Sequence, residues 1–365
     1  MRASERGSRR SRAPTETGRR PPVWVDLASP SHPVFFEAIA AGLDLPTVVT
    51  VREKTETVPL ARDTDFEFTI RGRDFDNTWL RTLGVPLRTI QLAVRTPEAA
   101  VSLSQRNAMC VLASKANGVP SIHFTDNDIT YYRETPLAEA GFNYFRSMAT
   151  AHVVPDAFQT AELTEYGASR DAIYTYDGFK EEVCVADFDP DPTFLDRLPF
   201  DEFVVLRPEA IGAAYIDLAP EESLVPDVLA RAVDAGLNVV YLPRRPGDRE
   251  HATGYPDDRV FVPDSPLPGL QLAWHADCTL TGSGTMAREA AAMNKPAVSF
   301  FPHTMLSVDQ RLVRQERIFH SRDAADIVDY LTGLSNEAVA PGLNRARAVR
   351  DEVVDITDGV IDDVV

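Results

Sequence analysis

The sequence predicts an α/β protein of two domains, each a parallel sheet covered by helices on both faces. Short apolar runs of strand length alternate with helical stretches along most of the chain, and a Pro- and Asp-rich segment interrupts the alternation at 187–202. Such alternation is typical of βαβ units, whose strands pair in parallel. A chain of 365 residues with 44% apolar content can fill two hydrophobic cores.

The first domain is expected over residues 21–186. It opens with the strand PVWVDLA (22–28), a loop that carries His32, and the helix FFEAIAAGL, which ends at Gly42. The other elements expected here are the strands TVVTVRE (47–53), FEFTI (66–70), MCVLAS (109–114) and SIHFT (121–125) and the helix TWLRTLGVPLRTIQLAV (78–94).

The segment DFDPDPTFLDRLPFDE (187–202) is the expected linker, because its prolines remove the backbone donors that a central strand or a helix needs. The second domain follows over 203–335. Its expected strands are FVVLRPEA, LNVVYLPRR, RVFVPD, CTLTGSG and AVSFFP, and its clearest helices are LVPDVLARAVDAG and MAREAAAMN. Residues 336–365 are expected to contain a last helix that packs back across the hinge.

The charge of the chain is strongly negative. There are 55 Asp and Glu residues against 37 Lys and Arg, a formal net charge of −18, and lysine occurs only at 54, 115, 180 and 295. This composition is typical of a protein that works in molar salt, as in halophilic archaea, where a Debye length of about 3 Å screens self-repulsion. An ordinary acidic protein is the alternative. In either case nucleic acid and anionic membranes are not expected partners.

Cysteine usage and the lack of long apolar runs predict a cytoplasmic protein. The three cysteines, Cys110, Cys184 and Cys278, lack CxxC spacing, which favours apolar packing over disulfides or a zinc site. No apolar run approaches the roughly 18 residues of a membrane-spanning helix. Residues 1–20 are rich in Arg and Ser, and no apolar segment follows the twin arginine at 9–10, so we expect a disordered basic tail and no export signal.

The stretch CTLTGSGTMAREA places Gly282, Ser283, Gly284 and Thr285 between a strand and a helix. The first N–H groups of a helix lack intrahelical partners and attract anions, and glycine lets a phosphate approach the backbone. One turn further, Glu289 could accept hydrogen bonds from the hydroxyls of a ribose. A capped turn beside an exposed glutamate is the alternative interpretation.

The stretch GSGTMAREAAAMNKP closely resembles the signature of an uncharacterised family, domain of unknown function 354. VDLASPSHPVFFEAI, YDGFKEEVCVADFDPDP, VVLRPEA and VDQRL resemble further blocks of that family, so the resemblance covers roughly residues 22–335. The family is similar to GT-B glycosyltransferases and to non-hydrolysing UDP-N-acetylglucosamine 2-epimerases. The resemblance therefore implies two Rossmann-like domains in a GT-B arrangement, with the nucleotide-sugar held by the second domain in an inter-domain cleft.

The resemblance also assigns roles in binding a nucleotide-sugar. It implies that Ser283, Gly284 and Thr285 hold the diphosphate, with Thr285 at a position where the epimerases have glycine, and that Glu289 holds the ribose. Asp309 and Gln310 (SVDQRL) resemble the acidic-Gln pair that binds donor-sugar hydroxyls in GT-B enzymes, although an N-capping aspartate is the alternative. It implies no metal ion and no other cofactor, since arginine and a helix dipole would neutralise the diphosphate.

Other polar residues follow strands that should open into the same cleft. Arg207 and Glu209 follow the first strand of the second domain, where an arginine suits a diphosphate and a surface ion pair is the alternative. The matching epimerase block begins with histidine, where this chain has Leu206. His303, after the strand AVSFF, could bond a phosphate or a sugar.

Three residues of the first domain are candidates for acid–base chemistry. His32 is the expected general base on an acceptor hydroxyl, because the ordinary pKa of histidine lies near neutral pH, although a lone loop histidine is often structural. Asp126 and Asp128 (FTDNDI) could be acid–base groups or acceptor ligands, and an Asp-rich turn is the alternative.

These features leave three functions open. The leading hypothesis is a GT-B-type glycosyltransferase that uses a nucleotide-diphosphate sugar, with UDP the expected nucleotide, in glycan or glycoconjugate synthesis. The second is a UDP-sugar 2-epimerase, which Leu206 disfavours. The third is a nucleotide-sugar-binding protein that performs no chemistry.

Overall fold

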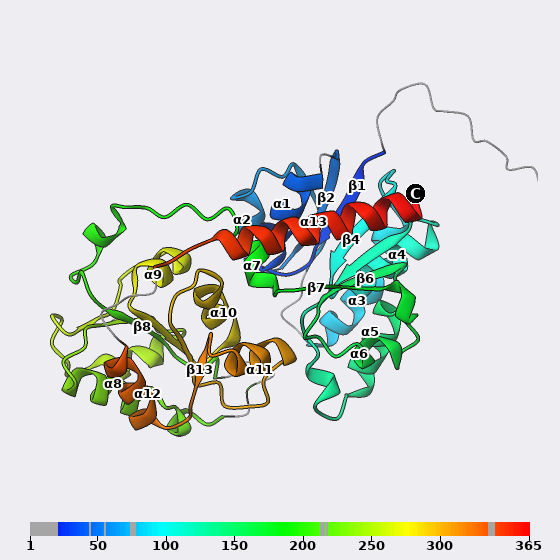
Figure 1. The fold of residues 1–365 in the computed structure, drawn as a ribbon. Coiled ribbons are helices and arrows are strands. Elements are labelled where there is room, and N and C mark those ends of the chain that lie inside the picture. The colour runs from blue at the N-terminus through cyan, green and yellow to red at the C-terminus, as the bar shows by residue number, and fades with distance from the viewer. Residues whose placement is uncertain are drawn as a thin grey trace, which may run out of the picture.

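Two parallel β-sheets organise the chain (Figure 1). The computed structural model describes residues 21–43, 45–54, 56–73, 78–211, 216, 218–334 and 340–365. The tail expected at 1–20 lies outside the described residues. Within them, every strand pairing of both sheets is parallel. The predicted α/β fold with two parallel sheets is confirmed.

The first sheet has seven strands in the order β3-β2-β1-β4-β5-β6-β7. The strands are β1 (Val23–Leu27), β2 (Thr47–Glu53), β3 (Phe68–Arg73), β4 (Val101–Gln105), β5 (Ser121–Phe124), β6 (Ala151–Pro155) and β7 (Ile173–Tyr176). The helices between and after them are α1 (His32–Leu43), α2 (Thr57–Arg62), α3 (Thr78–Val94), α4 (Ala108–Ala116), α5 (Leu137–Arg146), α6 (Ala161–Thr164) and α7 (Lys180–Val185). Short 3₁₀ turns lie at Ile129–Tyr131, Arg170–Ala172 and Phe194–Arg197.

The prediction of a strand at 109–114 was wrong. This run lies in α4, and the strand is the preceding β4. Asn107 begins the helix, since its side-chain oxygen accepts a hydrogen bond from the N–H of Cys110 at 3.3 Å. Most of α4 is buried, so its sequence reads as a continuous apolar run and loses the helical period. Ser102 and Ser104 interrupt the apolar run of β4, so the sequence does not mark it as a buried strand, although both side chains are fully buried.

The second sheet has six strands in the order β10-β9-β8-β11-β12-β13. They are β8 (Val204–Arg207), β9 (Val239–Tyr241), β10 (Val260–Phe261), β11 (Cys278–Thr281), β12 (Ala297–Ser299) and β13 (Phe319–His320). The helices are α8 (Val225–Asp234), α9 (Gly269–His275), α10 (Gly284–Ala292), α11 (Ser307–Arg314) and α12 (Ala324–Gly333), with 3₁₀ turns at Pro220–Glu222 and Pro246–Ala252. All five strands predicted for this domain are present.

The last helix, α13 (Asn344–Val364), runs along the helix layer of the first sheet (Figure 1). Its residues Val349 and Val353 are buried in the first hydrophobic core, with α1 and α7. Ala346, in its first turn, joins a different cluster, in which Phe179 next to α7 packs with Ala290 of α10. Apolar side chains of α7, α10 and α13 thus pack together between the two domains.

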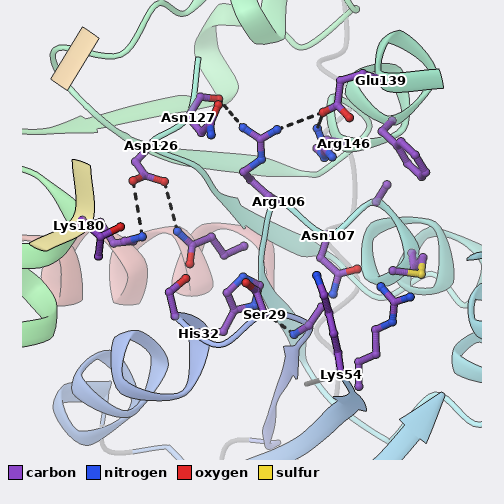
Figure 2. Close-up of a pocket in the computed structure, with 18 of the residues that line it drawn as sticks. Ser29, His32, Lys54, Arg106, Asn107, Asp126, Asn127, Glu139, Arg146 and Lys180 are labelled. Atoms are coloured by element: carbon purple, nitrogen blue, oxygen red, sulfur yellow. Dashed lines mark hydrogen bonds and ion pairs between the residues drawn. The ribbon is translucent and has the colours of Figure 1, made fainter. Parts of the chain in front are cut away.

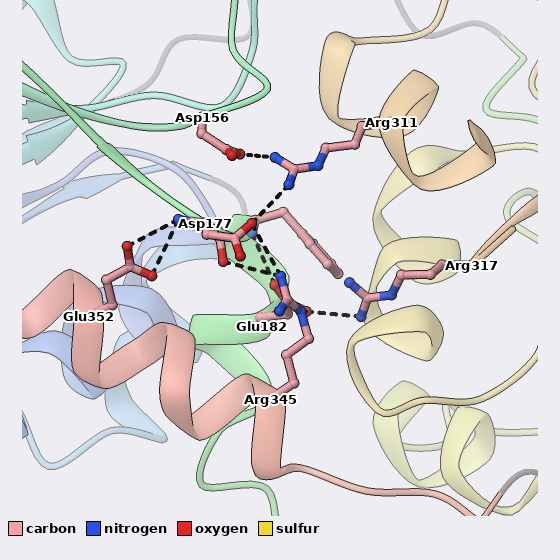
Figure 3. A network of polar contacts seen from close by, with 8 residues as sticks. Asp156, Asp177, Glu182, Arg311, Arg317, Arg345 and Glu352 are labelled. Carbon is pink, nitrogen blue, oxygen red and sulfur yellow. Dashed lines mark hydrogen bonds and ion pairs between the residues drawn. The ribbon is translucent and has the colours of Figure 1, made fainter. Parts of the chain in front are cut away.

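Ion pairs reinforce the same contact on its solvent side (Figure 3). Glu182 of α7 is fully buried and accepts a hydrogen bond from Arg317, which precedes β13, at 2.9 Å. Arg311 of α11 pairs with Asp156 and Asp177, which follow β6 and β7. Carboxylates of the first domain therefore hold arginines of the second. Among the described residues, no helix has the length and apolar character needed to cross a membrane.

Candidate functional site

A cavity of about 620 Å³ opens at the carboxyl ends of the first-sheet strands (Figure 2). The loops after β1, β2, β4 and β5 form most of its wall, together with α5 and the first residue of α7. Thr285 and Arg288 of α10 and Leu306 before α11 close it from the second domain. Strand order changes direction at β1 and β4, and such a switch point is where open α/β sheets bind ligands.

The lining of the cavity is positively charged although the whole chain carries −18. Two of the four lysines in the chain lie here. The cationic lining residues are Arg52, Lys54, Arg106, Arg146, Lys180 and Arg288, and the carboxylates are Asp126 and Glu139. Positive charge concentrated in a concave, partly desolvated site attracts anionic ligands.

A chain of buried charges crosses the floor of the cavity from one domain to the other. Lys180 Nζ lies 3.7 Å from Asp126 Oδ2 and 3.6 Å from Glu181 Oε1. Arg288 Nε lies 3.0 Å from Glu181 Oε2, and its Nη1 lies 2.9 Å from Asp309 Oδ1. Buried charges are tolerated when each has a partner, so this network fixes the position of Lys180 and Arg288.

Burial and the charges of this network shift the pKa values of Asp126, Asp309 and the neighbouring Glu289. Burial opposes ionisation of Asp126, but Lys180 and Arg288 outweigh burial and lower its pKa. Burial, and then the neighbouring Glu181, raise the pKa of Glu289 to about 7. Burial also raises the pKa of Asp309 in spite of Arg288. Asp126 is therefore ionised more readily than Glu289 or Asp309, and it lines the cavity.

His32 begins α1 and lines the cavity, but its environment does not suit a strong base. Burial, and then Lys180, lower the pKa of His32 to about 3, so its imidazole is neutral. Its Nδ1 accepts a hydrogen bond from the backbone N–H of Ala28 at 3.1 Å, so the ring proton lies on Nε2. This tautomer favours a hydrogen-bond donor over the general base that the sequence suggested.

The Gly/Ser/Thr turn brings only one of its side chains to the cavity. Thr285, in the first turn of α10, is exposed and lines it. Ser283 precedes the helix, but its hydroxyl accepts a hydrogen bond from Arg244 at 2.8 Å and does not cap the helix. A Cβ on Gly284 would lie 2.6 Å from Arg288 Nη1, so this glycine leaves room for the arginine.

Gly282 is required by packing. A Cβ at this position would lie 2.6 Å from the backbone nitrogen and Cα of Glu209. Glu209 itself is buried, and its carboxylate is used internally by Arg322 at 2.7 Å and by Ser223 at 2.9 Å. Arg207 ends β8, and its Nε has no hydrogen-bond partner. Arg207 does not line the cavity, and the glutamate of this block has a structural role.

The other predicted residues lie around α11. Gln310 donates to the carbonyl oxygen of Met305 at 2.9 Å. His303 packs edge-on against Phe301. Both carboxylate oxygens of Asp128 accept backbone hydrogen bonds, one from Gln159 at 3.0 Å and one from Ser307 of the second domain at 3.1 Å. Asp128 therefore joins the two domains and does not line the cavity.

Three of the predicted residues, His32, Asp126 and Thr285, line the cavity together. The remaining predicted residues are not part of its wall. The sequence reading missed Lys180, Glu181, Arg288 and Arg106. Lys180 did carry a signal, because it is one of only four lysines and lies in the conspicuous block YDGFKEEV. Within the described part of the chain, no three His, Cys, Asp or Glu side chains gather as metal ligands would.

The arrangement of the two sheets is shared with known enzymes. The chain is similar to a UDP-N-acetylglucosamine 2-epimerase, with a TM-score of 0.70 and 16% identity over 94% of this chain and 97% of that one. It is also similar to the Methanocaldococcus jannaschii UDP-GlcNAc 2-epimerase in complex with UDP-GlcNAc and UDP, with a TM-score of 0.68 and 11% identity over 92% and 99% of the two chains. The glycosyltransferase of kitacinnamycin aligns with a TM-score of 0.61 and 14% identity over 95% and 99%. The predicted GT-B arrangement is confirmed.

The sequence itself matches one relative and one family. An uncharacterized protein of Methanocaldococcus jannaschii is 22% identical over 325 residues, which cover 85% of this chain and 90% of that protein. Residues 22–364 match the family described as "Protein of unknown function (DUF354)", and the chain belongs to that family.

Proposed function

We propose that the protein is a glycosyltransferase-like enzyme that uses a nucleotide-diphosphate sugar, with UDP the expected nucleotide. The observation that carries this proposal is the cavity between the sheets, where Thr285 at the start of α10 faces the strand ends of the first domain. Its volume of about 620 Å³ is within the range of about 300–1,000 Å³ that small-molecule sites occupy. Support comes from the similar fold of an enzyme solved in complex with UDP-GlcNAc and UDP.

The diphosphate is expected at the N-terminus of α10. This helix offers unpaired backbone N–H groups and the positive end of its dipole, and Thr285 adds a hydroxyl. Arg288 lines the cavity one turn further along and is held in place by Glu181 and Asp309. A fixed guanidinium at this position would neutralise the charge that develops on the departing nucleoside diphosphate. Glu289 remains the candidate for the ribose.

Asp126 is better placed than His32 to remove the acceptor proton, because it lines the cavity and the Nδ1 of His32 already accepts a backbone hydrogen bond. Lys180 and Arg288 lower the pKa of Asp126, so it is a weak base that takes the proton as the bond to the leaving diphosphate breaks. In the proposed step the acceptor oxygen forms a bond to the anomeric carbon of the donor. The bond from that carbon to the diphosphate oxygen breaks, and its electron pair leaves with the nucleotide. The hydroxyl proton passes to the Asp126 carboxylate.

Epimerisation of a UDP-sugar is the second candidate, because the two structures with the higher TM-scores reported above carry that name. It requires acid and base groups on both sides of a sugar carbon. The described carboxylates of the cavity wall are Asp126 and Glu139, and Glu139 is held by Arg106 and Arg146. Because Glu139 is held by two arginines, Asp126 lacks a second acid or base among these carboxylates, which favours transfer over epimerisation. A binding protein without chemistry is the third candidate.

A binding measurement tests the donor site. We expect UDP and UDP-N-acetylglucosamine to raise the midpoint of thermal unfolding in about 2 M KCl, and a ligand at 100 times its Kd adds about 2.7 kcal/mol. Thr285→Val should reduce the shift. The matched control is Thr253→Val, which changes an exposed threonine outside the cavity. No shift with any nucleotide, or an equal loss in both variants, would refute the donor site.

Product analysis then separates the candidate reactions. We expect slow release of UDP from UDP-N-acetylglucosamine, which an acceptor accelerates, and loss of this release in Asp126→Asn. Accumulation of the C2 epimer with the nucleotide still attached would identify an epimerase. Nucleotide binding without any product would leave the binding protein.

A further inference from the structure

We propose that the acceptor of this enzyme carries an anionic group, a carboxylate or a phosphate, that binds between Arg106, Arg146 and Lys54 at the first-domain end of the cavity. The inference rests on the proposed function and names the class of its second substrate. The three side chains come from the loop after β4, from α5 and from the loop after β2.

Two guanidinium groups at this end share a single carboxylate. Arg106 Nη2 lies 3.1 Å and Arg146 Nη1 lies 2.8 Å from the same oxygen of Glu139. Their side chains are only 25% and 11% exposed. Burial, and then repulsion from Arg146, lower the pKa of Arg106. Desolvated positive charge in excess of its carboxylates is costly, and a bound anion would compensate it.

Lys54 adds a third positive charge, which has no counter-ion among the described residues. It is half-buried in the cavity wall and makes no ion pair or side-chain hydrogen bond with the described residues. Its charge helps to lower the pKa of His32. A lysine whose ammonium group no described side chain binds, in a chain with only four lysines, suits recognition of an anion.

The backbone holds Arg106 in a strained conformation. Its φ is 44°, in the left-handed region that costs a non-glycine residue about 1–3 kcal/mol. Its Nη1 donates to the carbonyl oxygen of Asn127 at 2.8 Å. The next residue, Asn107, donates to the buried Asp26 at 2.6 Å, and Arg88 pairs with the same carboxylate. These hydrogen bonds hold the backbone at 106–107 in its strained conformation, which keeps the guanidinium of Arg106 at the cavity wall.

Gln105 supplies an acceptor beside these cations. Its side chain is buried and lines the cavity, and its Oε1 has no hydrogen-bond partner. Its Nε2 faces Asp126 at 3.4 Å. A ligand hydroxyl that donates to Gln105 would lie near the carboxylate proposed to remove its proton. The acceptor therefore combines a hydroxyl group and an anionic group.

The donor diphosphate is expected elsewhere in the cavity. Arg288 of α10 and Lys180 of α7 are already paired with Glu181. Figure 2 shows the Asp126–Lys180 pair on one side of Arg106 and the Glu139–Arg146 pair on the other. In the same view Lys54 lies below Arg106, also away from the Asp126–Lys180 pair, so the positive charge in excess of carboxylates lies around Arg106.

Matched probes of the full chain test the proposal in about 2 M KCl with UDP present. Glucose 6-phosphate, glucuronate and neutral glucose are compared by their shift of the thermal unfolding midpoint. We expect an affinity for at least one anionic probe that is tenfold or more above that for glucose and that falls about tenfold in Lys54→Gln. The control is Lys115→Gln, which removes the same charge from the exposed end of α4. Arg146→Gln is the second variant of the site.

Each result has one consequence. Preference for glucose 6-phosphate or for glucuronate identifies the anionic group as a phosphate or a carboxylate. Equal binding of glucose, no binding of either anion, or equal effects of the two lysine variants would overturn the proposal. Weaker UDP binding in Lys54→Gln, with the probes competing against UDP, would assign the cations to the donor and also overturn it. Loss of the UDP shift alone, with Lys54-dependent binding of an anion retained, would refute the donor site and keep the anion site.

Discussion

Glu289 makes the stability of the protein depend on pH. Burial, and then Glu181, raise its pKa from the ordinary value of 4.5 to about 7. Between these two values the folded state holds a proton that the unfolded state has released. The stabilisation from this group is therefore fully present below its unfolded pKa and is lost as the pH rises through 7.

Glu289→Gln should remove that dependence. We expect the variant and the wild type to have equal free energies of unfolding at pH 4, below the unfolded pKa, and the variant to be more stable at pH 8.5 by no more than about 3 kcal/mol. Urea unfolding at constant KCl measures the difference. Glu165→Gln, at an exposed position after α6, is the control. A difference from the wild type that stays the same at both pH values would contradict the expected ionisation.

The residues of the site could be predicted from sequence only where the neighbouring residues show that they lie at the end of a strand. Thr285 follows a Gly-rich strand end, and Asp126 follows an apolar strand, so both could be placed at the edge of a sheet. Arg106 and Arg288 could not, because their roles come from partners far along the chain, Glu139 and Asp309. Asp128 looked catalytic for the same reason, since the sequence does not show that the backbone of Ser307 binds it.

Among the elements, the second domain was easier to predict than the first. Its strands are short, apolar and bounded by Pro, Gly or charged residues, and each predicted one is present. In the first domain β4 and α4 are both buried, so the apolar run marked the helix and not the strand. Periodicity cannot distinguish a buried helix from a buried strand, and the cap at Asn107 was the local signal that did.

The turn between β11 and α10 allows a direct test of close packing. Gly282→Ala should destabilise the protein by about 1–3 kcal/mol, because the new methyl group meets the backbone of Glu209, which cannot move aside as a flexible side chain can. Gly141→Ala is the control, since nothing lies within 4 Å of its added Cβ and it lies inside α5. There alanine should stabilise by about 0.5–1 kcal/mol. Equal effects of the two substitutions on the unfolding midpoint would show that the contact with Glu209 is not tight.

At the scale of the whole molecule, the two sheets are tied together on both sides of α7. On the cavity side the buried charges run from Asp126 through Lys180 and Arg288 to the second domain. On the other side Glu182 binds Arg317 of the second domain at 2.9 Å and Arg345 of α13 at 3.0 Å. A short helix thus fixes the relation of the two walls of the cavity.

Glu182→Gln should weaken the connection between the domains more than either domain itself. Glu182 is fully buried. When its charge is removed, Arg317 loses this counter-ion and the half-exposed Arg345 keeps its pair with Asp177, so the expected cost is about 2 kcal/mol. We expect thermal unfolding, which a shared interface makes a single transition, to separate into two, with faster proteolysis in the segment 187–202. Glu352→Gln is the matched control, because among the described residues Glu352 of α13 accepts hydrogen bonds from the backbone of Asp177 in the first domain and from none in the second. If both variants unfold in one transition at the same midpoint, Glu182 does not couple the domains, and the cavity between them is held by the remaining contacts, among them Phe179 with α10, Arg288 with Glu181 and Ser307 with Asp128.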